Sequence, residues 1–389
     1  MSELQTIDQT YVAHTYGRFP VELVSGKGSE LYDTAGKRYI DLGTGIGTTS
    51  FGIADDAWLA AVTAQLGKVQ HTSNLYYTEP CARLAQLLCE KTGMKKVFFG
   101  NSGAEANECC IKVARKWAAE NKGPEYSTVI TLLNGFHGRT LTTLAATGQE
   151  HYHELFQPLT PGFVHVPAED LSALETAIRS NKTAALMVEC VQGEGGVIAL
   201  SREYLQGAAK LCEENNVLLI VDEVQTGNGR TGKLYSYMHY GLQPDLVSTA
   251  KGLGGGLPLG ACLMGEKVQD VFHPGDHGST FGGNPVCCAG ALSILSRLDD
   301  AFLAAVSAKA DFARSALIGA KGIESVGGLG FMIGLKTAKP AGEVVKKCME
   351  KGVLCLTAKD KVRLLPPLNI PEPVLAEAVE IIKQVCAEE

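Results

Sequence analysis

Short, continuously apolar runs alternate with longer amphipathic or polar segments between about residue 97 and residue 265 of this 389-residue chain. Apolar runs of this kind are typical of strands that helices cover on both faces, and connections of helical length join parallel strands. The pattern therefore predicts an α/β fold with a mostly parallel, seven-stranded sheet. The expected strands are Val97–Phe99, Val129–Leu133, Phe163–Val166, Ala184–Val191, Val217–Val221, Leu246–Ser248 and Gly260–Met264. The expected helices between them include Ala104–Glu120, Leu171–Ser180 and Arg202–Asn215.

The pattern of the chain changes near both ends of this region. Residues 1–45 are expected to form an N-terminal segment with a hairpin, residues 46–284 a large domain, and residues 285–389 a smaller α+β domain with which the N-terminal segment associates. In the hairpin, Leu31–Asp33 and Arg38–Ile40 flank a turn at Ala35-Gly36. In the small domain, helices are expected over Val286–Leu298, Ala301–Ile318 and Ala341–Lys351, and strands over Ile323–Val326, Phe331–Leu335 and through Leu356 and Leu364.

The charge and hydropathy of the chain exclude several classes of partner. The 35 lysines and arginines face 42 acidic residues, so the net charge of −7 provides no basic field to hold a nucleic acid or an anionic membrane. No segment approaches the roughly 20 consecutive apolar residues of a membrane span, and the opening MSELQTIDQT lacks the features of a signal peptide. We expect a cytoplasmic protein without nucleic-acid or membrane partners.

The sequence gives little support for a metal site or a nucleotide-binding phosphate loop. The twelve cysteines include no C-x-x-C and the histidines no H-E-x-x-H, so we expect no metal site and reduced thiols in the core. Residues 227–233 fit G-x-x-x-x-G-K, but Leu234 stands where a phosphate loop needs a magnesium-binding Ser or Thr. His137 is as consistent with a packed loop residue as with a catalytic one.

In an open parallel sheet, ligands bind beyond the carboxyl ends of the strands, so the residues after each run carry the functional signal. After Val97–Phe99, the small residues 100–104 lead into a helix whose free N–H groups suit a phosphate. The same turn is equally explained by Ser102 as a plain N-cap with Glu105 completing a capping box. After Val129–Leu133, Phe136 and Arg139 lie between glycines.

The aromatic side chain of Phe136 suits stacking on a planar ring, and Arg139 suits a bidentate hydrogen bond to a carboxylate. A surface loop with a solvated arginine explains the pattern as well. The strand with Glu189 leads into residues 192–196, where Glu194 beside glycines indicates either a mobile gate or a simple turn. Asp222 ends a strongly apolar strand and therefore needs a cationic partner, while Lys251 stands in a glycine-rich turn. A structural ion pair of Asp222 with Lys251 is the plain alternative.

A phosphate turn, a stacking ring, an acid for a ring nitrogen and a reactive amine are the parts that pyridoxal phosphate requires. Here the sequence resembles the class III, ornithine-type, pyridoxal-phosphate aminotransferases of fold type I, from about Tyr16 to Pro367. The motifs that carry the resemblance are NSGAEAN, FHGRT, VECVQGEGG, VDEVQTGNGRTGK, STAKGLGGGLPLG, STFGGNP and RLLPPL. So many ordered motifs make a chance match very improbable.

The resemblance implies a role for each residue that matches those motifs. Lys251 would bind the cofactor covalently and shuttle a proton, and Asp222 would keep the ring nitrogen protonated. Phe136 and Val224 would enclose the ring, with Gln225 near its phenolic oxygen. Thr280 would reach the phosphate from the other subunit of a homodimer. The implied cofactor-binding residues are Ser102, Gly103, Ala104, Phe136, Asp222, Val224, Gln225, Lys251 and Thr280.

The same resemblance implies the substrate class. Arg139 would bind the distal carboxylate and Arg363 the α-carboxylate of glutamate, while Glu194 would pair with Arg363 when the donor offers no carboxylate there. Ile46 stands where ornithine aminotransferases resemble this stretch with a tyrosine, and an apolar residue suits an acylated α-amine. With the opening around Tyr16, this is similar to the acetylornithine branch of the family, acting on N-acetylornithine and 2-oxoglutarate and producing glutamate, in arginine biosynthesis. Ornithine, succinylornithine or 4-aminobutyrate as donor, and a non-catalytic oligomeric scaffold, are the alternatives.

Overall fold

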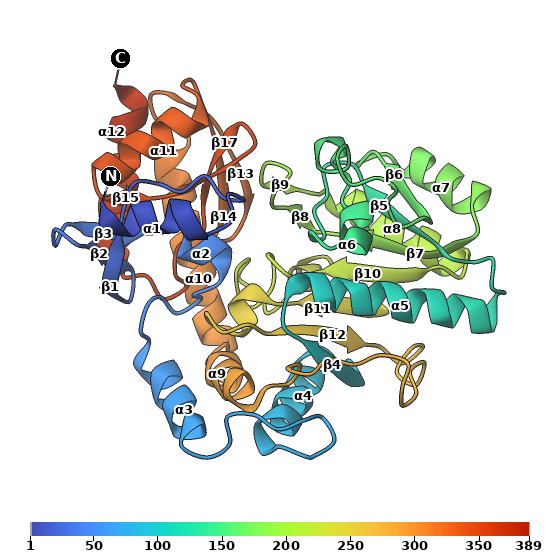
Figure 1. Ribbon diagram of the computed structural model, residues 1–389. Helices are drawn as coiled ribbons and strands as arrows, with labels where there is room; N and C mark the ends of the chain where they lie inside the picture. The colour runs from blue at the N-terminus through green and yellow to red at the C-terminus, as the bar shows by residue number, and fades with distance from the viewer. Residues whose placement is uncertain (1, 389) are drawn as a thin grey trace.

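A seven-stranded sheet forms the centre of the computed structural model, which describes residues 2–388 (Figure 1). Its strand order is β4-β12-β11-β10-β7-β5-β6, and only β12 runs antiparallel to its neighbours. The strands are β4 (Lys96–Gly100), β5 (Thr128–Leu132), β6 (Phe163–Val166), β7 (Thr183–Val188), β10 (Leu218–Asp222), β11 (Leu246–Thr249) and β12 (Gly260–Met264). The predicted α/β class, the mostly parallel sheet and its seven strands are thereby confirmed.

Helices cover both faces of this sheet. Along β10, Leu218 and Ile220 pack in one apolar cluster with α5, whereas Leu219 and Val221 pack in another with α8. This double burial explains why the strands read as continuous apolar runs. The helices of this region are α5 (Gly103–Asn121), α6 (Leu141–Ala146), α7 (Leu171–Ser180) and α8 (Arg202–Glu214). Short elements beside them are β8 (Val191–Gln192), β9 (Ile198–Ala199), η1 (Glu150–Tyr152), η2 (Ser236–His239) and η3 (Lys251–Leu253).

The two ends of the chain lie together on the other side of the molecule (Figure 1). One sheet, in the order β1-β2-β3-β15, joins the N-terminal segment to the C-terminal region, and a second, β13-β14-β17-β16, is antiparallel. The strands are β1 (Leu23–Lys27), β2 (Glu30–Asp33), β3 (Arg38–Asp41), β13 (Ile323–Leu329), β14 (Met332–Thr337), β15 (Val353–Leu354), β16 (Leu356–Ala358) and β17 (Lys361–Leu364). The expected hairpin of residues 31–40 is confirmed as β2 and β3.

The remaining helices surround these sheets and connect them to the large one. They are α1 (Glu3–Tyr11), α2 (Thr44–Gly47), α3 (Asp56–Leu66), α4 (Glu79–Thr92), α9 (Pro285–Leu295), α10 (Asp300–Leu317), α11 (Ala341–Glu350) and α12 (Glu372–Ala387). The sequence pattern predicted α9, α10 and α11, but not α1, which buries none of its side chains. Without a buried face, α1 has no amphipathic signal to detect.

Two further findings concern residues 2–388. None of the helices there is long and apolar enough to cross a membrane. All twelve cysteines of the chain are free thiols, as expected from the sequence.

Candidate active site

A cavity of about 430 Å³ opens beyond the carboxyl ends of the strands in the large sheet. Three turns that follow β4, β5 and β10, together with the turn that carries Lys251, converge on it. The residues predicted from the sequence that line it are Ser102, Gly103, Ala104, Phe136, Arg139, Asp222, Val224, Gln225 and Lys251. Residues from four separate motifs therefore meet in one place, as ligand binding at a parallel sheet requires.

The N-terminus of α5 forms one end of the cavity. Ser102 is its N-cap, and its hydroxyl accepts a hydrogen bond from the Glu105 N–H at 3.2 Å. The Glu105 carboxylate in turn accepts the Asn101 N–H at 2.8 Å. The predicted N-cap is thus confirmed, whereas the predicted capping box is wrong, because Glu105 accepts the N–H of Asn101 and not that of Ser102. Ser102, Gly103 and Ala104 at this helix end also line the cavity, where free N–H groups and the positive dipole end suit an anion.

Close packing leaves no room for larger residues beside this helix end. A Cβ added to Gly103 would lie 2.6 Å from a methyl carbon of Val224. A Cβ added to Gly260 would lie 2.1 Å from the carbonyl oxygen of Ser102. The glycines therefore allow the helix end, β12 and the turn after β10 to approach one another closely.

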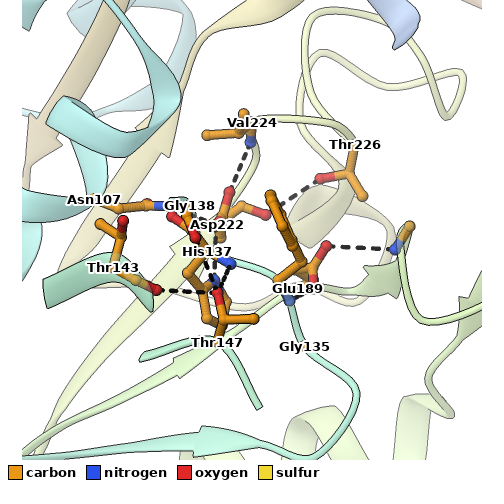
Figure 2. A network of polar contacts seen from close by, with 12 residues as sticks. Asn107, Gly135, His137, Gly138, Thr143, Thr147, Glu189, Asp222, Val224 and Thr226 are labelled. Carbon is orange, nitrogen blue, oxygen red and sulfur yellow. Dashed lines mark hydrogen bonds and ion pairs between the residues drawn. The ribbon is translucent and has the colours of Figure 1, made fainter. Parts of the chain in front are cut away.

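Asp222 lines the cavity and lies within a network of polar contacts (Figure 2). Its Oδ2 accepts hydrogen bonds from Asn107 Nδ2 and from His137 Nδ1, both at 2.8 Å, and its Oδ1 accepts the Val224 N–H at 2.9 Å. Burial opposes protonation of His137, but the hydrogen bond to Asp222 and the negative charges of Asp222 and Glu189 together outweigh it, so the pKa of His137 is raised. The raised pKa favours a protonated His137, which would be the cationic partner that a buried Asp222 requires.

This arrangement corrects the plain alternative drawn from the sequence, in which Asp222 and Lys251 form an ion pair. Within residues 2–388, the Lys251 amine has no hydrogen-bond or ion-pair partner. The sequence left the role of His137 open because the two residues are 85 positions apart and nothing local links them. Figure 2 shows the FHGRT loop bringing the imidazole under the carboxylate.

The buried Glu189 holds the FHGRT loop through hydrogen bonds. One of its carboxylate oxygens accepts the Phe136 N–H at 2.9 Å and the other the Gly193 N–H at 3.4 Å, and burial raises the pKa of Glu189. The side chain thereby ties the loop that carries the pocket aromatic to the turn after β8. The sequence interpretation of a carboxylate in a gate or a turn did not include this structural contact.

Lys251 begins η3 immediately after β11, with a positive φ of 45°. The amine is half-buried at the cavity wall, and burial lowers its pKa. A lysine held in this way is more often neutral and therefore more nucleophilic than a solvated one. The next residue, Gly252, has no space for a side chain, because an added Cβ would lie 2.5 Å from Ser50 Oγ.

Glu194 and Arg363 form an ion pair across the gap between the β8–β9 turn and β17. Arg363 Nη1 donates to Glu194 Oε1 and also to Gln225 Oε1 at 3.1 Å, while Gln225 Nε2 donates to Glu194 Oε1 at 3.1 Å. Burial opposes ionisation of Glu194, but Arg363 outweighs it and the pKa of Glu194 is lowered. Glu194 thus neutralises the buried charge of Arg363 in this structure.

Five predicted site residues lie outside the cavity lining: Glu194 and Arg363, which contact the lining residue Gln225, and Ile46, Tyr16 and Thr280. Ile46 is 42% exposed and belongs to a run of four residues, Thr44 to Gly47, that all have positive φ between 47° and 77°. Its neighbour Thr48 does line the cavity. Tyr16 is exposed on the N-terminal segment next to Arg18, and Thr280 is exposed on the surface of the chain. The roles of Tyr16 and Thr280 stay predictions.

The features of this cavity fit pyridoxal phosphate. Its lining combines a helix N-terminus, a carboxylate paired with an imidazole, and an amine without a hydrogen-bond or ion-pair partner within residues 2–388. Phe136 and Val224 line the same cavity. These are donor, acceptor and stacking groups of the right kinds for a phosphate, a ring nitrogen, an aldehyde carbon and a planar ring.

Comparisons with known proteins agree with this geometry. The sequence model of the family described as aminotransferase class III matches residues 11–386. Acetylornithine aminotransferase of Haemophilus ducreyi is 50% identical over 99% of this chain and 99% of its own length. The crystal structure of ornithine aminotransferase from Toxoplasma gondii superposes with a TM-score of 0.94 at 34% identity, covering 98% of this chain and 94% of that one. Acetylornithine aminotransferase from Elizabethkingia anophelis superposes with a TM-score of 0.88 at 32% identity, covering 99% and 98%.

Proposed function

The chain belongs to the class III aminotransferases, and from this membership we propose that it transfers the terminal amino group of N-acetyl-L-ornithine to 2-oxoglutarate. The products are N-acetyl-L-glutamate 5-semialdehyde and L-glutamate. Full-length identity of 50% to an acetylornithine aminotransferase supports the donor. The single structural observation that carries the proposal is the Glu194–Arg363 pair, which gives one site two charge states.

The enzyme is dependent on pyridoxal phosphate, as class III aminotransferases are. The bound cofactor supplies an aldehyde carbon that exchanges amino groups and a ring that accepts electrons, so that donor and acceptor react in turn at one site. Lys251 would hold the cofactor and move a proton at the reacting carbon. Asp222, supported by His137, would hold a proton at the ring nitrogen, and the N–H groups of Gly103 and Ala104 would bind the phosphate.

The two arginines would select the substrates by their carboxylates. Arg139 borders the cavity and would bind the carboxylate that both substrates carry at the end remote from the reacting carbon. When N-acetylornithine reacts through its terminal amine, no second carboxylate is present, and Glu194 stays on Arg363. When 2-oxoglutarate or glutamate enters, its α-carboxylate would displace Glu194 and pair with Arg363. An exchange of one anion for another is needed because Arg363 is 3% exposed, and a buried guanidinium without an anionic partner would be costly.

Ornithine as the donor is the second candidate, since solved ornithine aminotransferases share this fold. The apolar side chain of Ile46 near the cavity favours the acetylated donor, because an ammonium group beside it would lose hydration without a partner. A non-catalytic scaffold is disfavoured by the intact lysine, aspartate and arginine set.

A homodimer with shared active sites is part of the proposal. Leu75, Tyr76 and Tyr77 are exposed by 87%, 70% and 105%, and Phe281 next to Thr280 is exposed by 59%. Exposed apolar side chains of this size mark a surface that a second copy would cover. Cytoplasmic location and the domain boundaries at residues 45 and 284 also stay proposals.

The Glu194→Gln variant tests the proposed gate. Loss of the Glu194 carboxylate leaves Arg363 free to bind anions, so the KM for 2-oxoglutarate should stay equal or fall. The KM for N-acetylornithine should rise about tenfold, because the reacting end of this substrate has no carboxylate to pair with Arg363. Steady-state kinetics with each substrate varied would show this split. Equal loss for both substrates would contradict the gate, and no turnover of N-acetylornithine by the wild type would contradict the function.

A further inference from the structure

Arg139 is held by aromatic rings rather than by hydrogen bonds. Its guanidinium carbon lies 4.1 Å from the ring centroid of Tyr152 and 5.5 Å from that of Phe136. The two rings meet edge to face, with centroids 6.1 Å apart. Within residues 2–388, the guanidinium has no hydrogen-bond or ion-pair partner. All of its N–H donors therefore stay available for a ligand.

The backbone next to Tyr152 is fixed from one side by a buried histidine. Tyr152 ends η1, and the following residue, His153, is 4% exposed. His153 Nε2 lies 2.9 Å from the Leu144 carbonyl oxygen and 2.7 Å from that of Thr147, at the end of α6. Since both contacts are to carbonyl oxygens, Nε2 is the donor. The histidine thus fixes the turn that carries the ring.

The same segment is bonded to the loop that carries Arg139. Asn134 N–H donates to the Gly148 carbonyl at 2.8 Å, and Gly148 N–H donates to the Gly135 carbonyl at 3.1 Å. The side chain of Gln149 adds hydrogen bonds to the carbonyls of Asn134 and Gly135 at 3.3 Å and 3.2 Å. The ring of Tyr152 and the base of the Arg139 loop are therefore parts of one hydrogen-bonded unit.

We propose that Tyr152 is a positioning residue that stacks on Arg139 and holds its guanidinium edge toward the carboxylate shared by both substrates. The proposal rests on the proposed function of Arg139. A ring binds the face of a guanidinium and leaves the N–H edge free, which a carboxylate or amide partner would not do. An arginine already confined on a ring also loses less conformational entropy when the substrate binds.

Two substitutions separate the ring from its hydroxyl group. Tyr152→Phe keeps the stack, and Tyr152→Leu removes it while keeping an apolar side chain of moderate size. We expect Tyr152→Leu to raise the KM for both N-acetylornithine and 2-oxoglutarate about tenfold, with kcat changed less than about threefold, and Tyr152→Phe to match the wild type. A change in both KM values follows because both substrates would use Arg139.

Tyr126→Leu is the matched control. Tyr126 also lies against cations, with Lys122 Nζ at 4.6 Å and Lys182 Nζ at 4.9 Å from its ring centroid, but it precedes β5 at the edge of the sheet opposite the cavity. Its loss should leave both KM values unchanged. The visible absorption of bound cofactor and the thermal midpoint of each variant show whether it is folded and loaded.

The outcomes distinguish this inference from the proposed function. If Arg139→Lys raises both KM values but Tyr152→Leu leaves them at wild-type levels, the role of Tyr152 alone is overturned. Wild-type KM values in Arg139→Lys would overturn the substrate role of Arg139 itself. Loss in Tyr152→Phe equal to that in Tyr152→Leu would assign the effect to the hydroxyl group and overturn the stacking argument. A fall in kcat with unchanged KM would likewise overturn it.

Discussion

His137 Nδ1 lies 2.8 Å from Asp222 Oδ2, and the two side chains are 1% and 3% exposed. The residues come from different segments, the FHGRT loop after β5 and the end of β10, two parallel strands that lie on either side of β7 in the sheet. Asn107 from α5 completes the contacts of the same oxygen. The Asp222 carboxylate is therefore held in one orientation before any ligand arrives.

The raised pKa of His137 predicts how stability depends on pH. A histidine whose pKa is higher in the folded protein contributes stability that is fully present below its unfolded pKa of about 6.5 and is lost as the pH rises through the folded pKa. The thermal midpoint of the wild type should therefore exceed that of His137→Gln most at about pH 6 and progressively less toward about pH 9.

Calorimetry of both proteins across this pH range measures the difference. His165→Gln serves as control, because His165 is half-buried, hydrogen-bonds Thr131 and does not line the cavity. Burial lowers the pKa of His165 to about 4. The thermal midpoint of the wild type should therefore not exceed that of His165→Gln by more at about pH 6 than at about pH 9. A His137 difference that is constant with pH, or grows as the pH rises, would show that His137 is not charged beside Asp222.

Ile46 illustrates a conflict between stability and function. Its φ of 64° is left-handed, which costs a β-branched residue roughly 1–2 kcal/mol. Asparagine adopts this region at lower cost, so Ile46→Asn should raise the free energy of unfolding by about 1 kcal/mol. The same change should lower the preference for N-acetylornithine over ornithine about tenfold, since a polar amide replaces the apolar side chain proposed to favour the acetylated donor.

Thermal unfolding and kcat/KM for the two donors test both parts. Thr48→Val, a change at the neighbouring cavity residue, tests whether any alteration of this turn has the same effect. A less stable Ile46→Asn protein would contradict the strain argument. An unchanged donor ratio would contradict the role of Ile46 at the substrate rim.

The shared site of the proposed homodimer can be tested with mixed subunits. Lys251→Ala abolishes the amine, and Thr280→Asp places a negative charge where the phosphate is expected. Each pure variant should be inactive, whereas a dimer with one subunit of each should recover about half of the wild-type activity, because one of its two sites combines an intact Lys251 with the partner's intact Thr280.

Co-expression with two affinity tags isolates the mixed dimer for this measurement. If Thr280 acted within its own chain, every site that has Lys251 would also carry the aspartate, and no activity would return. An active Thr280→Asp protein would contradict a phosphate contact in either arrangement.

Several parts of this structure could be predicted from the sequence because they have a local physical signal. The strands of the large sheet are apolar on both faces, and each functional turn follows one of them. The topology alone therefore predicts that Ser102, Asp222 and Lys251 lie together at the carboxyl edge of the sheet. The resemblance then supplied their expected roles, together with the pairing of Glu194 and Arg363.

Other features have no local signal. The Asp222–His137 bond joins residues from separate turns, and the stack of Tyr152 on Arg139 depends on how residues 147–153 fold back on the FHGRT loop. The left-handed run at Ile46 opposes the intrinsic preference of that residue, as strained functional segments often do. Such features follow from tertiary packing and emerge only once the chain is folded.

The most direct test of the account is the visible absorption of the purified, cofactor-loaded protein as N-acetylornithine, ornithine and 4-aminobutyrate are added separately, without keto acid. We predict that the band of the cofactor bound to Lys251 disappears fastest and at the lowest concentration with N-acetylornithine and returns when 2-oxoglutarate is added. A band that responds only to another amine would contradict the proposed donor. A protein that develops no band after addition of pyridoxal phosphate would contradict the enzymatic function itself.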